Sequence, residues 1–391
     1  MNKTLIVLQS IGYGGSMTSL INLMSLIDYK YKKNIDVLFM DPYGELYNDA
    51  NNVMNIVCDR TIEAVTLPRN KQINLHKYFL WGYRAFLCIC AKLHNKSTLD
   101  YAYEKVAKKY EDKYSCVIAY QESIATNFVS KIDCEKKITW VHNDYSNVVK
   151  MYNTKEKFIS VYNKFDKIVC VSKAGMNNFK RYSGIDEDKI TFIYNTLIEN
   201  TIREKANKCN PLVEESSIEN KIKLVSSGRF ANQKRFDKLV EAAHMLDKEK
   251  FDFKWYVLGE GPLFDEIKKR VIEYGLEDKV ILTGAMTNPF PIIKMADVFV
   301  LTSDFEAHPM VANEALILGK PVITTCFESA KEVVRHEVNG LICGMDAEDI
   351  YMSIKRIIID KNLFIELTKN AQANKYDNKD IISKVLKIIE E

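Results

Sequence analysis

Two glutamates in the second half of the chain have the spacing of a site for a phosphorylated sugar. Glu306 and Glu314 lie eight residues apart in SDFEAHPMVANEALILGKPVITT. Residues 303–310 follow an apolar strand and open a helix, with Pro309 at a plausible first helical position, so free backbone amides there can hold a phosphate. Carboxylates on either side of such a site accept paired hydrogen bonds from a sugar diol. Taken alone, this spacing more often reflects a helix N-terminal acid and a solvated glutamate.

A basic motif precedes these glutamates. GRFANQK at 228–234 follows a predicted strand, so Arg229 and Lys234 emerge at the carboxyl end of that strand, where open α/β sheets bind ligands. Two fixed cations there can neutralise a diphosphate. An Arg and a Lys in an isolated loop are more often solvated surface, so the combination of the two motifs carries the prediction.

The first half of the chain has two weaker signals. Gly12, Tyr13, Gly14 and Gly15 lie between the first predicted strand and the first helix, as in a glycine-rich loop that approaches a phosphate. A tight strand-to-helix turn explains these residues equally well. His142 ends a predicted strand in TWVHNDY, although a lone histidine there is more often structural.

Several motifs in order resemble the carboxyl half of glycosyltransferase family 4. They are GRFANQK, VLGEGPL at 257–263, LTGAM at 282–286 and ADVFVLTSDFEAHPMVANEALILGKPVIT, and the resemblance covers residues 221–345. It implies a GT-B fold, in which two doubly wound Rossmann-like α/β domains face a central cleft. It also implies transfer from a nucleoside diphosphate sugar, with retention of anomeric configuration and with neither a metal nor a cofactor.

The resemblance also implies a role for each motif. Arg229 and Lys234 bind the donor diphosphate, Glu306 and His142 contact the donor sugar, and Glu314 binds the ribose. These roles make His142, Arg229, Lys234 and Glu306 the catalytic candidates. The backbone amides of Met310 and Val311 reach the distal phosphate, and Ala285 and Met286 lie near the nucleobase. The donor-binding set is Gly14, Gly15, Gly228, Arg229, Lys234, Gly259, Ala285, Met286, Glu306, Ala307, His308, Pro309, Met310, Val311 and Glu314.

Three residues depart from the family pattern. Ala307 and His308 stand where many members have a glycine and an aromatic residue, so the donor sugar cannot be inherited from the family. Arg235 follows Lys234 in place of the frequent glycine. We expect phosphate binding to survive these changes better than sugar identity does.

Two other motifs have the form of metal sites. Asp186 and Asp188 match the DxD of metal-dependent transferases but lie in the polar turn SGIDEDKI. Cys90 and His94 share one helix face, yet a pair lacks the four ligands of a structural zinc site. We therefore predict no metal site.

The elements that position these residues alternate between strand and helix along nearly the whole chain, which is typical of parallel sheets with crossover helices. We expect an N-terminal acceptor-binding domain over 1–198, a polar linker over 199–220 and a nucleotide-sugar-binding domain over 221–360. Helices over 361–391 are expected to pack back across the domain junction. The predicted strands are 5–8, 35–40, 53–57, 116–120, 138–141, 168–171, 191–193, 222–225, 253–258, 280–282, 298–301, 321–324 and 341–343.

Composition excludes several classes of protein. The 391 residues, 47% hydrophobic and 27% charged, fit two or three globular domains and neither a disordered chain nor a disulfide scaffold. A net charge of +3 gives no indication of nucleic-acid binding. Nine cysteines without framework spacing favour a reducing compartment, so we expect a cytoplasmic protein. Residues 4–27 are too polar for a membrane span and the apolar start is too short for a signal peptide, so we expect the mature chain to be the whole chain.

A stretch with no Asp or Glu runs from residue 64 to residue 99. It mixes basic and aromatic residues as an interfacial helix on anionic lipid does, and residues 69–96 are therefore candidates for peripheral binding at the inner face of the cytoplasmic membrane. A core helix with solvated basic residues is the equal alternative. The basic residues are Arg69, Lys71, Lys77, Arg84, Lys92 and Lys96, beside Tyr78, Phe79, Leu80, Trp81, Tyr83, Phe86 and Leu87.

The family resemblance thus implies a retaining transferase that moves a sugar, from UDP by family usage, to a hydroxyl of a bacterial surface glycan, teichoic acid or lipid-linked precursor. The first alternative is a noncatalytic binding subunit of the same fold, against which the four intact residues Arg229, Lys234, Glu306 and Glu314 argue. The second is a dinucleotide oxidoreductase. It needs a fuller GxGxxG and an acid about 20 residues further on, and Asp41 fits that spacing poorly.

Overall fold

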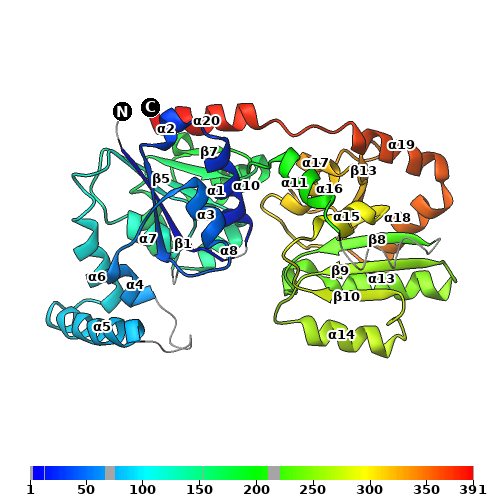
Figure 1. Ribbon diagram of the computed structural model, residues 1–391, viewed down its shortest axis with the longest axis horizontal. Helices are drawn as coiled ribbons and strands as arrows, with labels where there is room; N and C mark the ends of the chain where they lie inside the picture. Colours follow the sequence, from blue (N-terminus) through cyan, green and yellow to red (C-terminus); the bar gives the residue numbers. More distant parts are fainter. Residues whose placement is uncertain (1–2, 13, 67–74, 153, 210–220, 391) are drawn as a thin grey trace. The chain divides into compact units, whose positions relative to one another are not determined.

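The computed structural model describes residues 3–12, 14–66, 75–152, 154–209 and 221–390. They form two compact units, Met1–Thr196 with Asn378–Glu391 and Leu197–Asp377. Each unit has one parallel sheet with helices packed against it (Figure 1). The predicted fold of two doubly wound Rossmann-like domains is therefore confirmed.

The sheet of the first unit has seven strands in the order β3-β2-β1-β4-β5-β6-β7. The order reverses between β1 and β4, which is where open parallel sheets place their ligand crevices. The strands are β1 (Thr4–Ser10), β2 (Ile35–Asp41), β3 (Asn55–Val57), β4 (Cys116–Ala119), β5 (Lys136–Val141), β6 (Lys167–Cys170) and β7 (Ile190–Phe192). The helices are α1 (Gly15–Leu26), α2 (Tyr29–Lys32), α3 (Tyr47–Val53), α4 (Arg60–Thr66), α5 (Leu75–Leu93), α6 (Thr98–Ala107), α7 (Ile124–Val129), α8 (Tyr145–Lys150), α9 (Lys155–Tyr162), α10 (Lys173–Ser183) and α20 (Asn378–Glu390).

The sheet of the second unit has six strands in the order β10-β9-β8-β11-β12-β13, with its reversal between β8 and β11. The strands are β8 (Ile222–Ser227), β9 (Phe253–Leu258), β10 (Val280–Gly284), β11 (Val298–Leu301), β12 (Val322–Thr325) and β13 (Gly340–Cys343). The helices are α11 (Glu199–Ala206), α13 (Phe236–Lys248), α14 (Phe264–Glu273), α15 (Phe290–Met295), α16 (Met310–Ile317), α17 (Ala330–Val333), α18 (Ala347–Ile359) and α19 (Lys361–Gln372).

Both faces of the second sheet are buried, as its apolar strands require. Along β9, Trp255 and Val257 enter one hydrophobic cluster, whereas Tyr256 and Leu258 enter the cluster on the opposite face. Successive side chains of a strand point to opposite faces, so helices must cover both. This double cover leaves the carboxyl ends of the strands as the polar edge where loops can hold a ligand.

All thirteen predicted strands are present, with ends shifted by a few residues. One start was wrong, because Val53 is the last residue of α3 and β3 begins only at Asn55. The segment 199–220, expected as a linker, begins with α11, whose Ile202 packs with Met310 and Ile317 of the second unit. Residues 210–220 lie outside the described part of the chain. At the other end, α19 belongs to the second unit and α20 to the first.

Helix α5 exposes one apolar face. Its opposite face packs on the first unit through the buried side chains of Leu80, Leu87 and Ala91. The exposed apolar residues are Tyr78, Phe79, Trp81, Phe86, Ile89 and Leu93. Within the described residues, no helix has the length and apolar character needed to cross a membrane.

Candidate functional site

Glycines bring the strand ends of the second sheet close together. Gly259 has φ +130°, a conformation that favours glycine, and a Cβ there would lie 2.0 Å from the carbonyl oxygen of Gly228. Gly259 N–H in turn donates to the Gly284 carbonyl at 2.9 Å. The loops after β8, β9 and β10 therefore lie side by side, with little side-chain bulk between their backbones.

Lys234 and Glu306 meet at this edge, from the loops after β8 and β11. Lys234 Nζ lies 2.6 Å from Glu306 Oε1, and Ser303 Oγ donates to the same oxygen at 2.7 Å. Ser329 Oγ donates to the Glu306 carbonyl at 2.7 Å, which fixes the backbone that carries the carboxylate. The pair is mostly shielded from solvent, so its attraction is screened less than that of a surface ion pair. An ammonium and a carboxylate are thus fixed beside each other at a sheet edge.

Hydrogen bonds to backbone carbonyls tie the two loops together. Thr302 Oγ1 donates to the Lys234 carbonyl at 2.7 Å, and Asp304 N–H donates to the Gln233 carbonyl at 2.9 Å. Gln233 Nε2 donates to the Phe305 carbonyl at 2.7 Å. These bonds hold the loop after β8 against the loop after β11. They therefore fix the position of Lys234 relative to Glu306.

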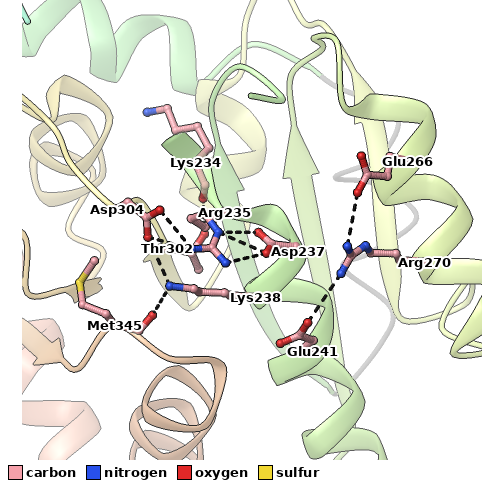
Figure 2. A network of polar contacts seen from close by, with 10 residues as sticks. All are labelled: Lys234, Arg235, Asp237, Lys238, Glu241, Glu266, Arg270, Thr302, Asp304 and Met345. Atoms are coloured by element: carbon pink, nitrogen blue, oxygen red, sulfur yellow. Dashed lines mark hydrogen bonds and ion pairs between the residues drawn. The ribbon is translucent and has the colours of Figure 1, made fainter. Parts of the chain in front are cut away.

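Arg235 turns away from Lys234 into a separate ion network, which Figure 2 shows. Its guanidinium donates to Asp237 at 2.8 Å and to Asp304 at 3.1 Å, and Lys238 Nζ lies 3.3 Å from Asp304. Arg235 has φ 51°, which is strained for a residue other than glycine. Hydrogen bonds to two carboxylates hold the Arg235 side chain at this turn. They stabilise a backbone conformation that the expected glycine would adopt without strain.

Helix α16 begins at Met310, and Pro309 is its N-cap rather than its first helical residue. The amides of Met310 and Val311 are in the first turn, where backbone N–H groups have no acceptor within the helix. Asn313 is buried, and its Nδ2 lies 3.4 Å from His308 Nε2. Burial lowers the pKa of His308 to about 4, so its imidazole is neutral at pH 7.

Glu314 lies one turn further along α16. Burial raises the pKa of its carboxyl group to about 7, against a smaller lowering effect of Lys205 on α11. A carboxyl group that is costly to ionise gains most from a ligand that donates hydrogen bonds to it. Glu314 is therefore suited to accept hydrogen bonds from hydroxyl groups.

Other residues that the sequence predicts to bind the sugar donor lie on the same edge. The side chains of Arg229 and Ala285 are exposed, and Met286 is half-buried against the cluster that contains Leu258. Gly228 leaves room for the alkyl chain of Lys234, because a Cβ there would lie 2.8 Å from Lys234 Cε. Ala307 is half-buried next to Glu306.

The first unit places its predicted residues at the carboxyl edge of its own sheet. Gly14 is the N-cap of α1, Gly15 is its first residue, and a Cβ on Gly14 would meet no atom within 4 Å. Tyr13 lies outside the described residues. His142 directly follows β5, its ring centroid lies 5.1 Å from that of Tyr120, and its N–H donates to Glu122.

Sequence reasoning missed several residues of these edges. Ser303, Gln233 and Asn313 lie within the predicted motifs, but the sequence does not indicate which residues of the site they contact. Glu122 follows β4 in AYQESIAT and is buried, with 3% of its surface exposed. An acid two or three residues past a predicted apolar strand was the available signal.

The motifs that looked like metal sites have structural roles. Asp186 accepts a hydrogen bond from Asp188 N–H at 3.1 Å as the cap of a short helical turn. Cys90 and His94 lie at the end of α5, where the His94 ring stacks on Tyr101. No group of three or more His, Cys, Asp or Glu with metal-binding geometry occurs among the described residues.

Comparison with known proteins gives a family match to most of the second unit. Residues 212–376 match the family described as glycosyl transferases group 1. A Campylobacter jejuni relative, N-acetylgalactosamine-N,N'-diacetylbacillosaminyl-diphospho-undecaprenol 4-alpha-N-acetylgalactosaminyltransferase, is 28% identical over 229 residues, 58% of this chain and 59% of that protein. A Bacillus subtilis relative, poly(glycerol-phosphate) alpha-glucosyltransferase, is 28% identical over 232 residues, 58% of this chain and 33% of that protein. The aligned regions thus span about three fifths and one third of these relatives.

Solved structures share the whole fold. HepE of Anabaena in complex with UDP and glucose has a TM-score of 0.77 at 18% identity, with 100% of both chains covered. TarM has a TM-score of 0.72 at 15% identity and covers 100% of this chain and 99% of its own. Both are GT-B glycosyltransferases, so the chain has the GT-B fold.

Proposed function

We propose that this chain, whose residues 212–376 match the family described as glycosyl transferases group 1, transfers a sugar from a nucleoside diphosphate sugar to a hydroxyl group with retention of anomeric configuration. The observation that carries the proposal is the Lys234–Glu306 pair, held at the carboxyl edge of the second sheet. The ammonium of this pair can bind a diphosphate, and the carboxylate can accept hydrogen bonds from sugar hydroxyls. A nucleoside diphosphate sugar has both kinds of group.

Each donor-binding residue has a proposed role in this reaction. Arg229 and Lys234 bind the diphosphate, and the amides of Met310 and Val311 reach its distal phosphate. Glu306 contacts the donor sugar and Glu314 the ribose. His142 of the first unit contacts the donor sugar from the acceptor-binding domain.

Stabilisation of the negative charge that develops on the leaving diphosphate is the main catalytic requirement of this reaction. Arg229, Lys234 and the N-terminus of α16 supply positive charge for it, and we propose that no metal or cofactor is needed. The leaving diphosphate accepts the proton of the incoming hydroxyl as the glycosidic bond forms on the same face, so the reaction requires no side-chain nucleophile.

UDP is the proposed nucleotide, because HepE of Anabaena, which has the same fold, was crystallised with UDP and glucose. A bacterial surface glycan, a teichoic acid or a lipid-linked precursor is the proposed acceptor. The names of the Campylobacter jejuni and Bacillus subtilis relatives refer to an undecaprenol-linked acceptor and to poly(glycerol-phosphate).

The proposed function is tested by incubation with UDP-, GDP- and ADP-sugars in excess EDTA, followed by NMR of the product and of released nucleotide. We expect release of one nucleoside diphosphate and a product with the anomeric configuration of the donor. Inversion would contradict the mechanism. Loss of activity in EDTA that magnesium or manganese restores would contradict metal independence.

We also propose that the exposed face of α5 binds anionic membranes. Aromatic and aliphatic side chains outside the core, on a helix without acidic residues, favour an interfacial position. The basic contribution is smaller than the sequence indicates, because Lys96 pairs with Glu104, and Arg69, Lys71 and the side chain of Lys77 lie outside the described residues. Lys92 is exposed beside the apolar face, and each such cation near anionic lipid contributes about 1 kcal/mol.

Cosedimentation with anionic and neutral liposomes tests this surface with a matched pair of variants. Ile89 on α5 and Ile365 on α19 are 62% and 64% exposed, so Ile89→Glu and Ile365→Glu change equally exposed side chains. We expect Ile89→Glu to reduce binding to anionic vesicles and Ile365→Glu to leave it unchanged. Equal binding by both variants, or no preference of the native protein for anionic vesicles, would contradict the assignment.

A further inference from the structure

Glu122 is a buried carboxylate whose partners are mostly backbone amides. It follows β4, it is 3% exposed, and it accepts a hydrogen bond from the N–H of His142. Further hydrogen bonds come from its own N–H, from the N–H of Asn143 and from the Asn143 side chain. Burial of a carboxylate is costly, so these N–H groups are what makes the position tolerable.

The backbone beside Glu122 is strained. Ser123 has φ 67° and ψ −101°, a conformation that residues other than glycine rarely adopt and that costs on the order of 1–3 kcal/mol. Ser123 is the N-cap of α7, so the sharp turn directly follows the buried carboxylate. Such strain persists only where the surroundings fix the chain, and it is typical of functional sites.

The hydrogen bonds of Glu122 connect it to the loop after β5. His142 and Asn143 form the loop that follows β5, the strand next to β4 in the sheet. Glu122 therefore connects two adjacent strand ends at the edge where ligands bind in this class of sheet. We propose that Glu122 is a positioning residue, whose carboxylate fixes the His142–Asn143 backbone and thereby the imidazole of His142 toward the donor sugar. This inference rests on the proposed function.

Direct acid–base catalysis by Glu122 fits the geometry less well. A general acid or base must reach the substrate within hydrogen-bonding distance, and Glu122 is enclosed and bonded to the loop after β5. The groups that face it are also buried. They are Tyr152 and Tyr162 around α9 and Cys170 of β6, and burial raises the pKa of each well above its ordinary value.

A pH dependence follows from this position. Burial raises the pKa of Glu122 to about 6, so its carboxylate gains a proton as the pH falls through that value. The protonated group accepts fewer hydrogen bonds from the loop. Tyr152, Tyr162 and Cys170 stay neutral in this range, so a variant that cannot titrate at position 122 isolates the contribution of Glu122.

The experiment compares Glu122→Gln and Glu122→Ala with Asp36→Asn in the full chain. Asp36 is equally enclosed in the same sheet, but it lies near the amino end of β2, where it accepts a hydrogen bond from Tyr114 at 2.5 Å. We expect kcat to fall about tenfold in Glu122→Gln and about a hundredfold in Glu122→Ala, because a misplaced contact near the reacting atoms costs that much. UDP affinity should not change in either, and Asp36→Asn should keep its kcat.

Two further readouts separate positioning from general support of the fold. Hydrogen exchange at the amides of His142 and Asn143 should accelerate in Glu122→Gln and not in Asp36→Asn. The decline of native kcat below pH about 6 should be absent in Glu122→Gln. Unchanged kcat together with unchanged exchange would overturn the inference. If the native protein binds UDP and transfers no sugar, the proposed function fails, whereas the exchange result still decides the role of Glu122.

Discussion

The carboxyl edges of the two sheets each hold a glutamate, but in opposite ways. In the first unit, Glu122 is enclosed and accepts hydrogen bonds mainly from backbone amides. In the second, Glu306 pairs with the ammonium of Lys234, and its side chain keeps 11% exposure. A carboxylate bonded to amides orders a loop, whereas one bonded to a lysine side chain that keeps some exposure can exchange that partner for a ligand. The comparison supports the two proposed roles, which are positioning at the first edge and donor binding at the second.

The largest expected effect is loss of the cations of the second edge. We expect Lys234→Ala and Arg229→Ala each to reduce turnover at least about a hundredfold, because each removes a positive charge that is proposed to stabilise the leaving diphosphate. Lys355→Ala is the matched control, since it breaks the 2.7 Å pair with Glu249 elsewhere in the same unit. Steady-state kinetics on folded variants measures the effect. Near-native turnover in either site variant would remove the diphosphate assignment.

The second prediction separates the two glutamates of the donor site. Glu306→Ala should mainly lower kcat, because the proposed role of Glu306 is to contact the reacting sugar. Glu314→Ala should mainly weaken UDP binding, because UDP has the ribose but not the sugar. Calorimetric titration with UDP, alongside kcat, distinguishes them, and equal losses of UDP affinity would contradict this division.

The third prediction is a pH dependence of donor affinity. The pKa of Glu314 is raised to about 7 by burial. In its proposed role, Glu314 binds the ribose hydroxyls in its ionised form. UDP affinity should therefore rise about tenfold from pH 6 to pH 8, and Glu314→Gln should remove that rise. The stability of the free protein should change in the opposite direction. Burial favours the neutral carboxyl group, so its contribution is lost as the pH rises from 4.5 toward about 7.

The smallest predicted effect concerns Arg235. Glycine relieves the strain of φ 51° but loses the ion network, whereas alanine loses the network and keeps the strain. Arg235→Gly should therefore be more stable than Arg235→Ala by about 1 kcal/mol, the reverse of the order in an ordinary helix. Urea unfolding measures the difference. A more stable alanine variant would show that the turn relaxes to another conformation.

The two edges also differ in how far the sequence predicts them. Apolar runs of strand length identified every strand, because parallel strands are buried on both faces. Arg229, Lys234, Glu306 and Glu314 were identified because they lie in motifs of a recognised order. Their local partners were not, because a contact such as Lys234 to Glu306 depends on two loops 72 residues apart in the chain.

Glu122 shows the limit of such reasoning. The position of an acid just past a predicted strand in AYQESIAT is a signal, but it does not distinguish a buried glutamate from a solvated one, since the carboxylate is bonded to the loop after β5. The start of β3 was wrong for a related reason. Val53 is apolar, yet it completes the last turn of α3 rather than the strand that follows.

Titration of the native protein and of Lys234→Ala with UDP, GDP and ADP tests the central claim most directly, because it requires no acceptor. Calorimetry should show that the native protein binds UDP more tightly than GDP or ADP, and that Lys234→Ala weakens UDP binding at least about tenfold, as loss of a charged hydrogen bond to phosphate does. Lys355→Ala should bind UDP as the native protein does. Absence of binding to all three nucleotides, or equal binding of UDP by Lys234→Ala, would contradict a donor site at the Lys234–Glu306 pair.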